Sequence, residues 1–518
     1  MRPIACQRRA ADRRERLRRR RGSHMTATEP MATAVLLSAF GLLLGASVAL
    51  SRASTRLGLP VALLFLLVGV LAGAEGIGRI PFDDYAFTFR LGTTALALIL
   101  FDGGLNTSFT SARAILLPAT VLATVGVLAT AGLIAVVAHA IGLPWTMALL
   151  LGAIVSSTDA AAVFSVLTAT GTRLRQRVGL TLEVESGLND PMAVILTTTL
   201  TAALVSGQTV QPLALGLDVL RELSVGAASG FAIARGGRWL LLRIRLPAAG
   251  LYPAFTLALA CLSFGLTTLM HGSGFLAVYV TGVVLGSGTL PHAVGIRRVH
   301  DTLGWLSQVL MFLLLGLLVY PSRVWQVAPI GVGLALFLAV VARPIVAVLC
   351  LAPFRYRWRE AAYVGWVGLR GAVPIVLATI PVMAGVEGAK PLFDVVFLIV
   401  VVGAILPGAT VPWATRLLRV ESAAPPPPKS SVEIDVRAPR GDELHAHFIS
   451  PHLAVAGALL SEIPFPQGAA VSMLERDGGL IAPSGDMRLA PGDHVYVIAP
   501  PGQRAEVELL FGRAEETG

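Results

Sequence analysis

Two aspartates lie near the middles of consecutive apolar stretches, each long enough to cross a lipid bilayer. Asp159 lies in LLLGAIVSSTDAAAVFSVL (149–167) and Asp190 in VGLTLEVESGLNDPMAVILTTTL (178–200). An ionisable side chain at mid-bilayer costs at least about 2.5–3.5 kcal/mol, so it is rare without a function. Two carboxylates at matching depth in neighbouring stretches predict one shared site for a cation or a proton.

Asp159 ends a polar run that begins at Ser156 and includes Ser157 and Thr158. Hydroxyl and carbonyl oxygens there can coordinate a cation, especially if the helix unwinds and frees its carbonyl groups. The alternative is a helix-packing face, because small and hydroxylated residues also bring membrane helices together. Packing explains the serines but not the aspartate, so we expect Thr158 and Asp159 to take part in binding.

The next stretch carries a denser polar cluster around Asp190. Ser186 and Asp190 are four residues apart, so they share a helix face and can both offer oxygen to one ion. Asn189 points roughly 100° away, which suits a hydrogen bond to the preceding span. Pro191 removes a backbone donor beside Asp190 and loosens that turn.

Glu185 is interpreted as structural, because a buried carboxylate needs a countercharge. Two intramembrane cations are available, Arg343 in VVARPIVAVL and Arg370 in GWVGLRGAVPIVLA. We expect Arg343 to be the partner and keep Arg370 as the second choice.

The stretch that contains Arg370 is itself a candidate broken helix, because Gly365, Gly368, Gly371 and Pro374 weaken its middle. With the polar run at 156–159, this places one interrupted span in each half of the chain, as in inverted-repeat transporters.

Asp102, in ALILFDGGL, ends the third apolar stretch. It is either a further oxygen ligand of the same site or a solvated residue at a helix end, and the sequence favours neither. A carboxylate in a partly desolvated cavity binds protons readily, so a proton and an alkali cation compete for its oxygens. Competition combined with alternating access gives exchange of a cation for protons.

Composition assigns the chain to multi-spanning membrane proteins. It is 55% hydrophobic and 14% charged, against about 25% charged residues in soluble domains. The predicted fold is all-α, with about thirteen transmembrane helices, inverted repeats and two broken helices, followed by a small α+β domain. The apolar stretches cover about 31–51, 58–75, 89–103, 114–138, 145–168, 178–205, 217–238, 247–269, 273–289, 302–320, 326–351, 361–385 and 393–415.

The arginines predict the orientation in the cytoplasmic membrane. They concentrate in one set of alternate loops, whereas the other set holds only Arg79, Arg90, Arg323 and Lys390. The positive-inside rule then places the C-terminus in the cytoplasm.

The first thirty residues, 1–30, form a basic tail with ten arginines that contradicts this orientation. We expect a mis-called start, with Met25 or Met31 as the beginning, rather than an anchor for anionic lipid. Charge elsewhere is nearly balanced and gives no reason to expect nucleic-acid binding.

Four parts follow from these patterns: the basic tail, a transmembrane exchanger domain (31–420), a proline-rich linker (421–430) and a cytoplasmic domain (431–518). The last part alternates short β-prone runs with Gly, Asp and Pro turns. It contains no G-x-G-x-x-G, so a dinucleotide site is unsupported. A core this small makes dimerisation plausible. The cysteines show no metal or redox spacing, so no cofactor is expected.

At these residues the transmembrane part resembles the monovalent cation:proton antiporters that include bacterial NhaP proteins and animal sodium/proton exchangers. The matching strings are SSTDAAAVFSVL, LEVESGLNDPMAV and GWVGLRGAVPIVLA, with FDGGL weaker. The resemblance implies a homodimer with a dimerisation domain and a moving six-helix core. It assigns ion binding to Asp190 with Asn189 and Ser186, and matches Thr158 and Asp159 to an unwound pair. It matches Glu185 and an arginine of the eleventh or twelfth span to a structural ion pair. The family's third-span acid is more often glutamate, where this chain has Asp102.

The C-terminal part resembles the TrkA-C (RCK-C) domain over SPHLAVAGALLSEIPFPQGAAVSMLERDGGLIAPSGDMRLAPGDHVYVIAPP. Antiporters with this domain are similar to potassium/proton antiporters of cell-volume type, and the domain often dimerises or binds a small ligand. The chain is therefore predicted to be a transporter rather than an enzyme, exchanging K⁺, and possibly Na⁺, for H⁺ in pH, cation and cell-volume homeostasis.

The alternative functions are a Na⁺/H⁺ antiporter, a regulated potassium channel and an intramembrane aspartyl protease. A channel needs a carbonyl-rich filter, and nothing like TVGYG is present. The protease dyad needs Tyr-Asp and Gly-x-Gly-Asp, whereas the contexts here are Thr-Asp and Asn-Asp-Pro. No metal is expected other than an alkali cation at Asp190 and Asp159.

Overall fold

The structure is a computed structural model that describes residues 31, 33–34, 37–50, 60–207, 211–244, 246–288, 290–422, 443–477 and 479–512. The predicted basic tail at 1–30 and all but the first two residues of the linker at 421–430 lie outside the described residues.

The larger part of the chain is helical, as its composition predicts. After a helix at Leu37–Leu50, the helices are α2 (Val61–Ala72), α3 (Tyr85–Asn106), α4 (Phe109–Arg113), α5 (Leu116–Val121), α6 (Val127–Ala140), α7 (Trp145–Val155), α8 (Ala160–Ala169), α9 (Gln176–Ser206), α10 (Pro212–Arg243), α11 (Leu251–Leu269), α12 (Gly274–Gly286), α13 (Ala293–Leu317), α14 (Pro321–Phe337), α15 (Arg343–Leu351), α16 (Trp358–Trp366), α17 (Val373–Met383) and α18 (Ala389–Leu417). Single π-helical turns at Leu122–Gly126 and Leu338–Ala342 join α5 to α6 and α14 to α15.

Several helices are long and apolar enough to cross a membrane. Among the described residues seven meet this test, or eight when α7 and α8 count as one bent span. Other apolar helices are shorter, including α2, α12 and α17. The chain is therefore a multi-pass membrane protein, although fewer helices meet the length test than the thirteen stretches predicted.

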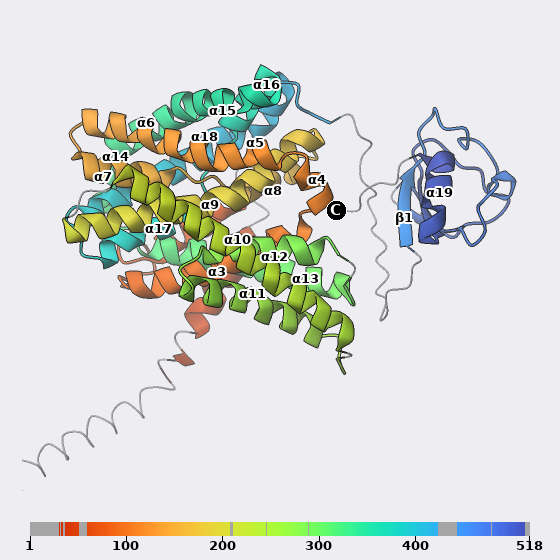
Figure 1. The fold of residues 1–518 in the computed structure, drawn as a ribbon, viewed down its shortest axis with the longest axis horizontal. Coiled ribbons are helices and arrows are strands. Elements are labelled where there is room, and N and C mark those ends of the chain that lie inside the picture. The colour runs from red at the N-terminus through yellow and green to blue at the C-terminus, as the bar shows by residue number, and fades with distance from the viewer. Residues whose placement is uncertain are drawn as a thin grey trace, which may run out of the picture.

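The helices pack in two groups. One group contains α2, α3 and α10 to α13, and the other contains α5 to α9 and α14 to α18. In Figure 1, α3, α11, α12 and α13 lie together in the lower part, and α6, α15 and α18 in the upper part. Within the first group, glycines let backbones approach closely, as membrane helices require. A Cβ at Gly282 of α12 would meet backbone atoms of α3 at Phe101 and Gly104.

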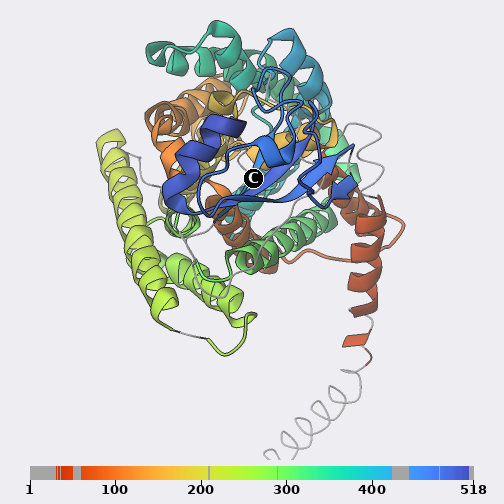
Figure 2. The same cartoon turned by 90° about the vertical axis from the view of Figure 1, so that its right-hand side faces the viewer.

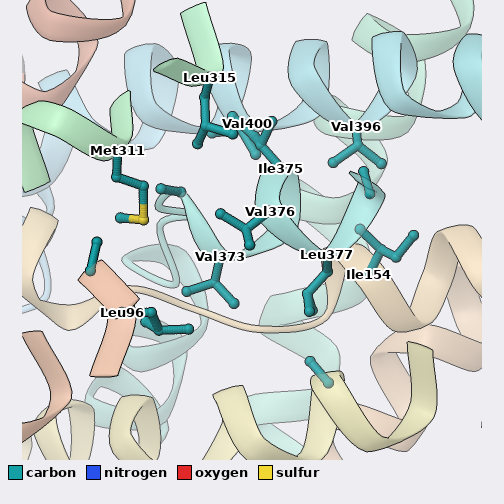
Figure 3. Close-up of a cluster of buried hydrophobic side chains, with 14 of the residues drawn as sticks. Leu96, Ile154, Met311, Leu315, Val373, Ile375, Val376, Leu377, Val396 and Val400 are labelled. Carbon is teal, nitrogen blue, oxygen red and sulfur yellow. The ribbon is translucent and has the colours of Figure 1, made fainter. Parts of the chain in front are cut away.

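Helix α17 lies where the two groups meet. Its side chains Val373, Val376 and Leu377 belong to one buried cluster with Leu96 of α3 and Ile154 of α7 (Figure 3). The buried apolar core therefore extends through α17 from one helix group to the other.

Two spans are interrupted as the sequence predicts. The axis bends by 40° between α7 and α8, where residues 156–159 are not helical. Residues 367–372 separate α16 from α17. We refer to these two segments together as the crossing.

The C-terminal part is a small α+β domain, seen in blue in Figure 2. Strands β1 (Glu443–Phe448), β2 (Ala470–Arg476), β3 (Gly479–Ile481) and β4 (His494–Ala499) form an antiparallel sheet in the order β1-β4-β2-β3. Alternate residues of β4, such as Val495 and Val497, share a core with Phe511 of helix α19 (Arg504–Phe511). The β-prone runs of the sequence correspond to β2, β3 and β4.

Candidate functional site

The two segments of the crossing are bonded to each other. The backbone N–H of Asp159 donates a hydrogen bond to the carbonyl of Leu369, at 2.7 Å. Glycines permit this approach, because a Cβ at Gly371 would collide with the Asp159 carboxylate and one at Gly368 would press on Arg343 and Thr158. Gly368 and Gly371, which predict a weakened helix in the sequence, are therefore needed for the close approach of the two backbone segments.

Asp159 is the N-cap of α8. Its Oδ1 accepts a hydrogen bond from the N–H of Ala162 at 3.3 Å, and the backbone at Asp159 is extended. Aspartate is a preferred N-cap because its carboxylate satisfies a free N–H and faces the positive end of the helix dipole. The side chain thus fixes where α8 begins.

Helix α9 holds the first segment in place through two polar side chains. Ser186 Oγ donates to the carbonyl of Thr158 at 3.0 Å and accepts from the N–H of Ala160 at 3.2 Å. Asn189 Nδ2 donates to Thr158 Oγ1 at 2.6 Å. The two Ser186 bonds satisfy backbone groups that the interruption of the helix leaves without partners, and the Asn189 bond fixes the Thr158 side chain. Ser186 and Asn189 therefore support the unwound segment directly.

Asp190 lies on α9 beside this network, with only 4% of its surface exposed. Its carboxylate faces the hydroxyl of Ser157, whereas Asp190 Oδ1 and Asn189 Oδ1 have no hydrogen-bond partner among the described residues. Buried oxygens without partners are costly. Such oxygens can replace the water molecules in the hydration shell of an alkali cation. Helix α9 continues past Pro191, so Asp190 sits in a regular helix rather than the loosened turn we expected.

Glu185 pairs with Arg343 in the interior. Arg343 Nη2 contacts Glu185 Oε1, and both side chains are 1% exposed. Thr158 Oγ1 lies 3.5 Å from the same Glu185 oxygen, which connects the pair to the crossing. Arg343 begins α15, immediately after the π-helical turn Leu338–Ala342.

Arg370 has a different set of partners. Its Nε donates to the carbonyl of Val155 at 3.2 Å, and its Nη1 donates to the carbonyl of Gly368. Val155 is the last residue of α7, so the guanidinium group satisfies a helix C-terminus and faces the negative end of its dipole. Of the two candidate countercharges, Arg343 bonds Glu185 and Arg370 bonds the interrupted backbone.

Asp102 lies away from these contacts. Its Oδ1 is 3.5 Å from Asn106 Nδ2 on the same helix, and its other side faces Gly304 of α13. The structure thus brings Asp159, Asp190, Ser186, Asn189 and Thr158 together, whereas it places Asp102 against α13.

Sequence reasoning missed three residues near this region. These are Glu183 on α9, Thr107 at the end of α3 and Tyr279 on α12. Thr107 Oγ1 bonds Glu183, and the ring of Tyr279 packs on Gly187. The one available signal was Gly187 itself, on the face of α9 that also carries Asp190.

The described residues hold no group of three or more His, Cys, Asp or Glu side chains arranged to bind a metal ion.

Each of the two parts of the chain matches a known protein family. Residues 40–417 match the family model for the transmembrane sodium/hydrogen exchanger, and residues 444–512 match the TrkA-C domain. The chain is 39% identical over 482 residues to the K⁺/H⁺ antiporter NhaP2 of Shewanella oneidensis, covering 92% of this chain and 83% of that protein.

Two further proteins are similar. The K⁺/H⁺ antiporter NhaP of Alkalimonas amylolytica is 41% identical over 401 residues, covering 77% of this chain and 69% of that protein. The solved sodium proton antiporter MjNhaP1 of Methanocaldococcus jannaschii superposes with a TM-score of 0.63, covering 74% of this chain and 99% of that chain at 23% identity. This last likeness concerns the fold.

Proposed function

The chain belongs to the sodium/hydrogen exchanger family, and from that membership we propose that it is a secondary antiporter exchanging K⁺ for H⁺ across the cytoplasmic membrane. One observation carries the proposal: Asp190 is buried beside an interrupted helix with a carboxylate oxygen that has no partner among the described residues. The names of the relatives NhaP2 and NhaP favour K⁺ as the cation.

In this proposal Asp190 is the group that trades the cation for the proton. When Asp190 is ionised, its free oxygen and the hydroxyl oxygen of Ser157 take the place of water around the ion. When a proton arrives, it occupies the same carboxylate and the cation leaves. Exchange then follows from competition, because one site cannot hold both charges.

The neighbouring residues position this site. Asp159 holds the N-terminus of α8 toward the ion, and Ser186, Asn189 and Thr158 keep the unwound segment in place. Glu185 and Arg343 act as a structural ion pair, because each neutralises a charge that would otherwise be buried alone. Arg370 keeps the two segments of the crossing joined. Asp102 is an accessory residue of the cation site.

The wider architecture completes the proposal. We infer thirteen membrane-spanning segments arranged as inverted repeats. In this scheme the helix group of α5 to α9 and α14 to α18 moves against the group of α2, α3 and α10 to α13. We also infer a homodimer in the bacterial inner membrane. The C-terminal domain lies in the cytoplasm in this scheme, where it dimerises or binds a small ligand and thereby regulates transport.

The decisive experiment uses the purified full-length protein in proteoliposomes that contain a pH-sensitive dye. A proton gradient is imposed, and K⁺ or Na⁺ is then added outside. The proposal expects K⁺ to collapse the gradient, and Na⁺ to do so less well. A larger response to Na⁺ would make the chain a Na⁺/H⁺ antiporter, and cation flux without a pH gradient would identify a channel.

A further inference from the structure

A second carboxylate lies on the same face of α9 as Asp190. Glu183, Gly187 and Asp190 are spaced by four and three residues, so they line one side of the helix. Seven residues correspond to about 10 Å along the axis. Glu183 is nearer the arginine-containing loop at 170–175, the predicted cytoplasmic side. It is partly exposed, whereas Asp190 is buried.

The ring of Tyr279 lies between the two carboxylates. It packs on Gly187 so closely that a Cβ there would come within 2.6 Å of its Cζ atom. Tyr279 is 6% exposed, and its hydroxyl faces Thr107 and Glu183. A phenol hydroxyl also accepts through its lone pairs, so this oxygen can contact an ion held by Glu183.

The hydrogen bond between Thr107 and Glu183 can be given up without leaving the Thr107 hydroxyl unpaired. Its hydroxyl has a single hydrogen and two acceptors within reach, the carbonyl of Gly103 at 2.8 Å and the Glu183 carboxylate. If a cation takes the carboxylate, the hydroxyl hydrogen still has the Gly103 carbonyl. The exchange therefore leaves no donor unpaired.

We propose that Glu183 is a second cation-binding carboxylate, which takes the ion from the cytoplasm before it passes the Tyr279 ring to reach Asp190. This inference rests on the proposed function. Glu183 then contributes to cation capture rather than to the exchange step itself, so its loss affects apparent affinity more than maximal rate.

The test titrates the cation against exchange rate in proteoliposomes. Removing a group that binds the cation before the exchange step raises KM, so we expect Glu183→Gln to raise the KM for K⁺ by about tenfold with the maximal rate within about twofold. Glu183→Asp, which keeps the charge, should remain near wild type. Glu222→Gln, on the partly exposed part of α10, is the matched control and should change neither constant.

Thr107→Val supplies a second, independent readout. It removes the hydroxyl that competes with the cation for Glu183, so it should change KM in the wild-type background and leave it unchanged when combined with Glu183→Gln. If Glu183→Gln does not fold, Thr107→Val alone decides. An unchanged KM in the folded variants would overturn the proposal for Glu183. The proposed antiporter function would still stand, provided that the wild-type protein shows exchange in the same assay.

A separate contact joins the end of the transmembrane part to the site helices. Leu174 and Glu421 form an antiparallel bridge, in which the N–H of Arg175 bonds Val420 at 3.0 Å and the N–H of Ser422 bonds Arg173 at 2.9 Å. Residues 170–175 connect α8 to α9, and Val420 is fully buried in a core shared with both helices. We infer that this bridge transmits the state of the C-terminal domain to the crossing.

The test of this bridge uses full-length protein only. Ser422→Pro removes the N–H that bonds Arg173, whereas Ser422→Ala retains it and serves as the control. We expect Ser422→Pro, and separately a ten-residue Gly/Ser insertion after Lys429, to shift the K⁺ concentration for half-maximal exchange at least about twofold, and their combination to equal either alone. No shift with Ser422→Pro, or additive shifts, would overturn the inference.

Discussion

The amide nitrogen of Asp159 donates its hydrogen bond to the carbonyl oxygen of Leu369, residues that belong to different interrupted spans. Each interrupted segment therefore supplies a hydrogen-bond partner for a backbone group of the other. Neither segment can shift alone without leaving an unpaired backbone group in the interior. The two interruptions are therefore joined directly at the backbone beside the proposed site.

We predict that Asp190→Asn abolishes K⁺-dependent proton movement in everted vesicles while the protein still inserts. The amide keeps the size of the side chain but cannot exchange a proton for a cation. Asp218→Asn, on the exposed surface of α10, is the matched control and should exchange like wild type. Retained exchange in the Asp190 variant would show that another residue carries the proton.

We predict that Glu185→Gln and Arg343→Met each lower the thermal stability of the purified protein. Each leaves one charge buried without its partner, which costs about 3–5 kcal/mol. The double variant Glu185→Leu with Arg343→Met should recover part of the loss. Arg175→Met breaks a more exposed pair with Glu360, worth about 0–1 kcal/mol, and is the control. Equal melting temperatures for the Glu185 and Arg175 variants would contradict a structural role.

We predict that Gly371→Ala slows exchange. Its new methyl group would collide with the carboxylate of Asp159, so the N-cap must move or the crossing must open. Gly403→Ala in α18, where a Cβ meets nothing within 4 Å, should leave the rate unchanged. The measurement is exchange rate per folded protein in vesicles, and matching rates for the two variants would show that Asp159 tolerates displacement.

The sequence predicts the interruptions well because their signals are local. A polar run ending at Asp159 and glycines around Arg370 both mark positions where a membrane helix is weak. The choice between Arg343 and Arg370 as partner of Glu185 depends on which helices cross, and that information is not local. The sequence could rank them but not exclude either.

Long-range contacts account for what was missed. The approach of Tyr279 to Gly187 joins α12 to α9, and nothing near Tyr279 in the sequence marks it as different from a packing residue. Similarly, Pro191 suggested a loosened turn, but α9 runs through it, because packing on both sides of this long helix outweighs one missing hydrogen bond. Fewer helices of the described residues meet the length test than the thirteen apolar stretches of the sequence, because interrupted spans consist of short helices.

The charges around the crossing have an electrical consequence. Three carboxylates, Asp159, Asp190 and Glu185, lie there with two guanidinium groups, Arg343 and Arg370. With all five ionised, the interior retains one negative charge, which one K⁺ or one proton neutralises. If Asp190 trades one K⁺ for one proton, as proposed, the occupied carrier is neutral in both directions of its cycle. Membrane voltage therefore acts on neither loaded form, and exchange should run at the same rate across polarised and unpolarised membranes.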